Sequence, residues 1–207
     1  MSAPSARTAV ATPVAAPEPD RVRLGLGLRE HRKARRLTLK DLSARSGVAL
    51  STLSKMELGQ ISVSYEKLAA VARALSLDVG QLFDPRAAAP LGMPAPSVVW
   101  SSADTAPAYS SGNYDYRMLA TDFPAKRMTP LFGRIVARER AQFPDFIRHP
   151  GEEFVMVKSG RVRIHFETGE LIELGRHESA YFDSGIGHIY LSLGRTDAQV
   201  LVVMSES

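Results

Sequence analysis

The sequence predicts a two-domain protein, in which an all-α domain of five short helices precedes an all-β domain. Apolar residues recur at helical spacing between residues 24 and 83, and capping residues stand where helices would begin. A stretch rich in Pro and Ala follows, and beyond it apolar and polar residues alternate in short runs bounded by Gly, Pro and Asp. The pattern therefore indicates a helical domain at residues 21–84, a linker at 85–98 and a β domain at 99–207.

Length and composition agree with this division. A chain of 207 residues that is 44% hydrophobic can build two modest cores. Residues 1–20 mix Ala, Pro, Ser and Thr and lack the apolar core of a signal peptide, so we expect a disordered N-terminal arm. No run approaches the roughly 18 apolar residues that would span a membrane. Because cysteine is also absent, we expect a soluble protein of the reducing cytoplasm.

The first two helices can be placed from their surface and their ends. Leu24 and Leu28 lie on one helical face, and basic residues surround them. Thr38 predicts the start of the second helix, because its hydroxyl can cap the helix while Asp41 reaches back to the free amide. Gly47 comes where this helix must end in a left-handed residue.

A tight turn at residues 46–49 leads into a third helix, in which Leu53 and Met56 point inward at a spacing of three. Two short helices joined in this way are typical of the motif that lays its second helix in a DNA major groove, although ordinary helical hairpins share the turn. Ser64 and Asp78 can cap two further helices, the last of which ends at residue 83.

The charge distribution favours the helical half as the part that binds nucleic acid. Residues 1–85 hold 13 Lys and Arg against 8 Asp and Glu, whereas residues 86–207 hold 13 against 14. A basic half attracts phosphates whatever their sequence, so this excess supports nucleic acid as a partner and says little about specificity.

Residues 24–83 resemble the lambda repressor and Cro class of helix-turn-helix domains, the Xre family. The motifs are R-x-x-R at 29–32, L-T-L-x-x-L at 37–42, S-G-V at 46–48, L-S-x-M-E-x-G at 53–59 and A-L-S-L at 74–77. The resemblance implies binding to double-stranded operator DNA, and it makes Glu57 a structural acid that closes the recognition helix. We expect the DNA contacts to come from Arg32, Thr38, Leu50, Ser51, Thr52 and Lys55.

Two residues depart from the pattern of this family. Ala49 stands where a capping Ser is usual, which should cost about 1 kcal/mol of helix-end stability. Leu50 can touch a thymine methyl group but cannot hydrogen-bond a base edge. The operator sequence therefore cannot be inferred from these residues.

The second half contains closely spaced runs that are typical of strands in a sandwich or small barrel. These runs are Tyr114 to Thr121, Leu131 to Ala137, Glu153 to Val157, Arg161 to Glu167, Ser179 to Asp183, His188 to Leu193 and Gln199 to Met204.

Two segments of this half, HPGEEFVMVKSGRVRI from residue 149 and LGRHESAYFDSGIGHIYLS from residue 174, resemble the two cupin motifs. Cupins are double-stranded β-helix barrels of the jelly-roll type. The first motif, H-x-H-x(3)-E-x(6)-G, is matched at His149, Glu153 and Gly160, with Ile147 in place of its first His. The second is matched at Gly175 and His188.

The residues that remain of the cupin ligand set are His149, Glu153 and His188. Two imidazoles and one carboxylate suit a divalent iron with open positions, and Zn, Ni or Mn are further candidates. Strand alternation would place His149 and Glu153 on the same face. The same three residues could also remain as a polar pocket without an ion. The candidates for the pocket lining are Tyr114, Tyr116, Ile147, Tyr181 and Tyr190, although aromatic residues in strands are more often core.

Together the two halves resemble the Xre-cupin regulators. This implies a transcriptional regulator, a homodimer whose cupin domain senses a small-molecule effector. The alternative is a mononuclear iron oxygenase, because the hydroxypropylphosphonate epoxidase family also joins a helix-turn-helix-like domain to a cupin and uses a His-x(3)-Glu and distal His triad. A third interpretation is a purely structural binding module, with neither DNA binding nor turnover.

Overall fold

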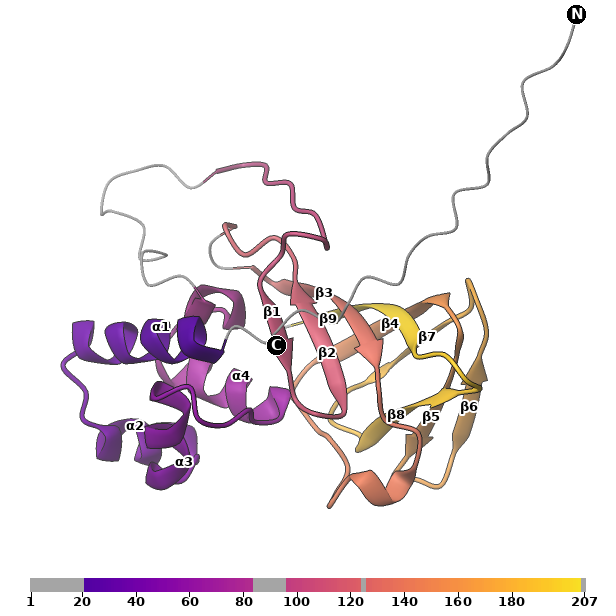
Figure 1. Ribbon diagram of the computed structural model, residues 1–207, viewed down its shortest axis with the longest axis horizontal. Helices are drawn as coiled ribbons and strands as arrows, with labels where there is room; N and C mark the ends of the chain where they lie inside the picture. Colours follow the sequence, from indigo (N-terminus) through magenta and orange to yellow (C-terminus); the bar gives the residue numbers. More distant parts are fainter. Residues whose placement is uncertain (1–20, 84–95, 124–125, 206–207) are drawn as a thin grey trace, which may run out of the picture.

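The computed structural model describes residues 21–83, 96–123 and 126–205, and it places a helical domain beside a β domain (Figure 1). The order of the two domains is as the sequence predicts. The expected N-terminal arm and residues 85–95 of the expected linker lie outside the described residues. None of the helices within the described part is long and apolar enough to cross a membrane.

The described helical domain contains α-helices and one short 3₁₀ helix. Its elements are α1 (Arg21–Ala34), α2 (Leu39–Ser46), α3 (Leu50–Glu57), α4 (Tyr65–Ala74) and the 3₁₀ helix η1 (Val79–Phe83). The prediction of five α-helices is therefore wrong for the last one. Five residues provide little more than one helical turn, a length at which the tighter 3₁₀ form is common.

The predicted ends of α2 are confirmed. The Thr38 hydroxyl accepts a hydrogen bond from the Asp41 amide, and the Asp41 carboxylate accepts one from the Thr38 amide, which completes a capping box. Gly47 ends the helix with φ at 71°. Neither Ala49 before α3 nor Ser64 before α4 makes a side-chain capping bond, so the predicted Ser64 cap does not form.

Two glycines allow α1 to pack closely on the rest of the domain. A Cβ atom at Gly25 would lie 2.6 Å from the carbonyl oxygen of Met56, and one at Gly27 would lie 2.1 Å from that of Leu82. Both distances are shorter than real Cβ contacts. The Gly25–Gly27 pair therefore serves the packing of α1 against α3 and η1.

The β domain consists of two antiparallel sheets, which agrees with the predicted sandwich or barrel. One sheet has the strand order β1-β2-β3-β9-β4-β7, and the other has the order β6-β5-β8. The strands are β1 (Ala108–Ser110), β2 (Tyr114–Met118), β3 (Met128–Ile135), β4 (Glu152–Ser159), β5 (Arg161–Phe166), β6 (Leu171–Leu174), β7 (Ser179–Asp183), β8 (His188–Leu193) and β9 (Ala198–Ser205), with a 3₁₀ turn η2 (Arg140–Gln142). The sequence runs match seven of these strands and miss β1 and β6.

The helical domain lies against β1, with α4 directed toward the β domain (Figure 1). Phe83 of η1 packs edge-on against Tyr109 of β1, with the ring centroids 6.3 Å apart. The Lys126 ammonium lies 3.8 Å from the carboxylate of Asp78, and both side chains are buried. The two domains are thus joined by apolar and ionic contacts between buried groups.

Candidate functional site

The recognition helix α3 presents its first turns outward. Leu53 and Met56 are buried in the core, whereas Leu50, Ser51 and Lys55 are exposed and Thr52 is half-buried. The structure therefore brings together the four residues that the sequence assigns to this surface. Their contact with DNA stays a prediction.

Arg32 and Thr38, the other two predicted DNA contacts, are engaged within the domain. Arg32 Nε lies 2.6 Å from Glu57 Oε1, Nη2 lies 2.8 Å from Glu57 Oε2, and Nη1 donates to the Leu37 carbonyl at 2.8 Å. The hydrogen bonds to Glu57, together with the charge of this carboxylate, raise the pKa of the Arg32 guanidinium. The Thr38 hydroxyl belongs to the capping box of α2. DNA contact by either side chain remains a prediction.

In the β domain, His149, Glu153 and His188 converge into one buried cluster. Glu153 Oε2 lies 2.9 Å from His149 Nε2 and 3.5 Å from His188 Nε2. One ligand atom from each residue lies within 4.8 Å of the other two. These are the only three metal-ligand side chains that gather in this way among the described residues.

The cluster forms for a different reason from the one expected. His149 precedes β4, which begins at Glu152, so the two residues do not share a regular strand. The chain bends at Gly151, where φ is 98°, and the His149 amide donates to the Ser184 carbonyl. This bend, rather than strand alternation, turns the His149 ring toward Glu153.

Neighbouring groups orient the cluster. His188 Nδ1 lies 2.9 Å from the Ile186 carbonyl. Since a carbonyl only accepts, Nδ1 carries a proton and Nε2 faces Glu153. The Tyr190 hydroxyl donates to the other carboxylate oxygen, Glu153 Oε1. His188 and Glu153 are therefore each held by a second hydrogen bond, as is usual for metal ligands.

The electrostatics favour an ionised carboxylate. Burial opposes ionisation of Glu153, but hydrogen bonds and charges from His149 and His188 outweigh it and lower the carboxyl pKa to about 2. Burial also disfavours the charged form of His188, yet the hydrogen bond to Glu153 and its charge prevail and raise the imidazole pKa. The carboxylate of Glu153 is therefore ionised at neutral pH.

A cavity of about 20 Å³ adjoins the cluster. Of the predicted lining residues, all but Tyr181 reach it, namely Tyr114, Tyr116, Ile147 and Tyr190. Tyr181 does not, and this prediction is corrected. Its side chain is 65% exposed, because β7 pairs Phe182 with Glu153 and leaves Tyr181 on the outer face opposite Phe154.

Tyr114 of β2 also lines this cavity. It is buried, and its hydroxyl accepts a hydrogen bond from the Tyr190 amide at 2.8 Å. The sequence misses one aromatic residue of the cavity, Tyr65, which comes from α4 of the helical domain. No local signal links Tyr65 to a pocket in the other domain.

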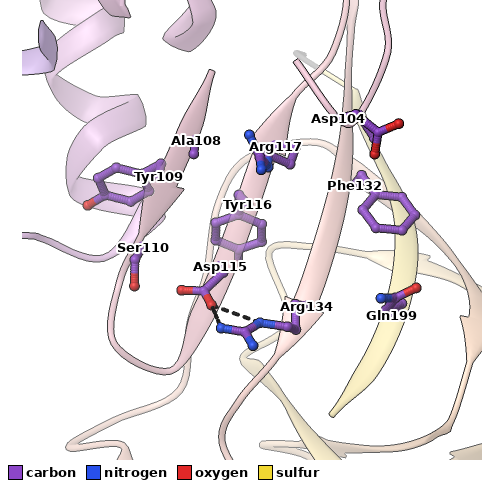
Figure 2. A pocket seen from close by; sticks show the side chains of 11 residues that line it. Asp104, Ala108, Tyr109, Ser110, Asp115, Tyr116, Arg117, Phe132, Arg134 and Gln199 are labelled. Atoms are coloured by element: carbon purple, nitrogen blue, oxygen red, sulfur yellow. Dashed lines mark hydrogen bonds and ion pairs between the residues drawn. The ribbon is translucent and has the colours of Figure 1, made fainter. Parts of the chain in front are cut away.

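A second hollow, of about 220 Å³, lies on the outer face of the six-stranded sheet that contains β2 and β3 (Figure 2). Figure 2 shows that Asp115 of β2 pairs with Arg134 of β3 there, beside Phe132. Tyr116 of β2 borders both this groove and the cavity beside the cluster, whereas Asp115 and Arg134 border only the groove. Larger size does not make the groove the functional site, because the metal-ligand set and the shifted pKa values of Glu153 and His188 belong to the cavity.

Known families match both domains. Residues 28–82 match the helix-turn-helix model HTH_3, and residues 136–204 match the cupin domain model. None of the curated protein sequences matches the chain. A solved HTH_3 family transcriptional regulator from Vibrio cholerae aligns over 90% of this chain and 97% of its own, with 19% identity and a TM-score of 0.59, a likeness that shows the fold.

Lower similarity links the chain to hydroxypropylphosphonic acid epoxidase from S. wedmorenis. Its structure aligns over 89% of this chain and 97% of its own at 19% identity, and the structure of its complex with fosfomycin aligns over 89% and 98% at 19% identity. Both TM-scores are 0.47. At that level the likeness establishes no shared activity.

The fold and the two sites define a class of two-domain proteins in which a helix-turn-helix domain precedes a cupin barrel. In this chain the N-terminal domain is a helix-turn-helix domain of the Xre-like HTH_3 type, and the C-terminal domain is a cupin.

Proposed function

We propose that this protein is a transcriptional regulator of the cytoplasm, which binds operator DNA through α3 and senses a small-molecule effector in its cupin domain. The observation that best supports this proposal is the exposed first turn of α3, within a domain that matches a helix-turn-helix family. Selection of duplexes from a randomised library, followed by fluorescence anisotropy, tests this proposal. Failure to enrich any duplex at low salt would overturn it.

Lys55 offers a quantitative test of the DNA interface. Its exposed ammonium lies on the outer face of α3, where we expect it to contact a phosphate. Lys55→Ala should weaken binding about tenfold at 0.1 M salt and reduce the slope of log affinity against log salt by about 1. Lys158→Ala, which removes an exposed cation from β4, serves as the matched control. Equal effects of the two variants would exclude Lys55 from the interface.

A homodimer is part of the proposal, because two recognition helices must reach half-sites about one helical turn apart, roughly 34 Å. The support is an exposed apolar surface ahead of β1. Val98 and Trp100 are 83% and 87% exposed, beside a hollow lined by Phe123, Met128 and Pro130. Exposed apolar surface of this kind is typical of protein interfaces, where Trp is enriched.

The single tryptophan of the chain allows a direct test of this interface. Trp100→Ala should convert the dimer to a monomer in light scattering after gel filtration. In the wild type, the Trp100 emission should shift to longer wavelength on dilution, as the indole becomes exposed to water. Leu171→Ala, at a leucine that is 60% exposed on β6, should leave the dimer intact. A monomeric wild type, or a dimeric Trp100→Ala variant, would contradict this assignment.

We also propose that His149, Glu153 and His188 hold a divalent metal ion. The donor set fits, because Nε2 of His188 faces the carboxylate while its Nδ1 is bound to the Ile186 carbonyl. When bound, the metal would supply a Lewis-acidic centre that attracts an oxygen donor of the effector.

The same donor set supports a second candidate function, a mononuclear iron oxygenase. Oxygen uptake on addition of ferrous iron, lost in His149→Ala, would favour the enzyme. The regulator is the better proposal, because α3 presents Ser51, Thr52 and Lys55 at its outer surface, within a domain that matches a helix-turn-helix family.

A further inference from the structure

The first turn of α4 lies in the mouth of the barrel. Tyr65, the first residue of this helix, is 8% exposed. Its ring packs edge-on against two rings of the β domain, with centroid distances of 6.0 Å to Tyr116 and 6.2 Å to His149. Among the residues that line the cavity, Tyr65 alone comes from the helical domain. The DNA-binding domain therefore forms one wall of the cupin cavity.

A second contact ties the same place to the β domain. The buried Tyr109 hydroxyl of β1 accepts a hydrogen bond from the Val63 amide at 2.9 Å and donates one to the Val63 carbonyl. Val63 stands two residues before Tyr65. The segment that enters α4 is thus held on both sides by aromatic residues of β1 and β2.

The cavity is too small for a ligand while Tyr65 is in place. Its volume of about 20 Å³ accommodates roughly one water molecule. Most other lining residues, such as Tyr114 and Val202, stand on strands whose backbones are paired on both sides. A larger molecule must therefore displace a wall, and Tyr65 is the part of the wall that comes from outside the β domain.

The start of α4 is also not fixed by a capping side chain. Ser64 makes no side-chain capping bond. The buried Oε2 atom of Glu66 has no hydrogen-bond partner among the described residues. Because a shift of this helix start breaks no pairing between strands, it costs less than the opening of a strand.

We propose that Tyr65 is the gate of the cupin cavity, and that a ligand in the barrel acts on the DNA-binding helices by displacing it. The inference rests on the proposed function and specifies its regulation. α4 packs against α2, and α2 packs against α3, so a displaced α4 start is transmitted to the recognition helix. A ligand that fits only when Tyr65 has moved binds the two arrangements unequally, which is the requirement for coupling.

The experiment uses 4-methylphenol, which has the shape of the tyrosine side chain, as its probe. Tyr65→Ala should leave a cavity that the probe fills, as engineered apolar cavities bind small aromatic molecules. Calorimetry should therefore detect binding to Tyr65→Ala and none to the wild type or Tyr65→Phe. Tyr181→Ala, which truncates an exposed tyrosine, is the matched control. The outer groove is present in all four proteins, so binding there would not distinguish them.

The coupling is measured on the duplex recovered from the random library. Tyr65→Ala should change its affinity by at least about fivefold, Tyr65→Phe by less than about twofold, and 4-methylphenol should return Tyr65→Ala toward the wild-type value. Hydrogen exchange in α4 should accelerate in Tyr65→Ala and slow again with the probe. If Tyr65→Ala does not fold, Tyr65→Leu takes its place with the same readouts.

A folded variant that binds no more 4-methylphenol than Tyr181→Ala would overturn the gate. Probe binding with unchanged DNA affinity and unchanged exchange would overturn the coupling. If neither the wild type nor any variant binds DNA, the proposed function fails, whereas calorimetry and exchange still decide whether Tyr65 closes the cavity.

Discussion

Replacement of Arg32 by methionine is expected to lower the free energy of unfolding of the helical domain by about 3 kcal/mol. The guanidinium makes a bidentate bond to Glu57, and the two side chains are only 12% and 7% exposed. Arg32→Met leaves a nearly buried carboxylate without its counter-charge, which is much more costly than loss of an exposed ion pair. Urea unfolding followed by circular dichroism at the helical band measures the change.

The β domain offers an exposed ion pair as a control. Arg163 donates two hydrogen bonds to one carboxylate oxygen of Glu173, and those side chains are 39% and 40% exposed. Arg163→Met should therefore cost less than about 1 kcal/mol. The double variant Arg32→Met/Glu57→Met should recover part of the loss, because it removes both charges. Equal costs for Arg32→Met and Arg163→Met would contradict the structural role of the pair.

This result bears on how a basic residue near a recognition helix is interpreted. The R-x-x-R pattern and the charge of α1 make Arg32 a candidate for phosphate contact. The contact with Glu57 joins residues 25 positions apart, and no local pattern reveals it. Weaker DNA binding by Arg32→Met would therefore have to be compared at equal folded fraction before a phosphate contact is inferred.

Elements set by neighbouring residues were predictable. The capping box of Thr38 and Asp41 and the left-handed Gly47 depend on side chains within a few positions. The strands β1 and β6 escaped prediction for a physical reason. β1 has three residues, and β6 exposes Leu171, Ile172 and Glu173 in succession, so neither shows the alternation of a half-buried strand.

In the candidate site, too, contacts that depend on residues far apart in the sequence could not be predicted. Glu153, His149 and His188 could be found from their residue types and spacing, although the bend at Gly151 that aims His149 could not. The assignment of Tyr181 failed because the face of an edge strand depends on its register with β4. Tyr65 could not be predicted, since its neighbours Tyr116 and His149 belong to another domain.

Removal of one ligand from the cluster should abolish metal binding. In calorimetry with Zn²⁺, the wild type should bind one ion, and Glu153→Gln should lose more than about 100-fold in affinity because a charged ligand is replaced by a neutral amide. Tyr190→Phe removes only the hydrogen bond to Glu153, so a loss of about tenfold is expected. His165→Ala, at a histidine on the outer face of β5, is the control and should change nothing. Equal affinities of Glu153→Gln and the wild type would exclude the cluster as the site.

The same cluster should make metal affinity depend on pH in one direction. Glu153 has a carboxyl pKa of about 2 and stays ionised, so it does not titrate near neutrality. The raised imidazole pKa of His188 means that a proton competes with the metal for Nε2. In the metal-free protein, the proton on His188 stabilises the fold below the unfolded pKa of about 6.5, and this contribution is lost as pH rises through the folded value. Zn²⁺ affinity should therefore rise as the pH increases through the raised His188 pKa and level off above it, whereas an affinity independent of pH would place the ion elsewhere.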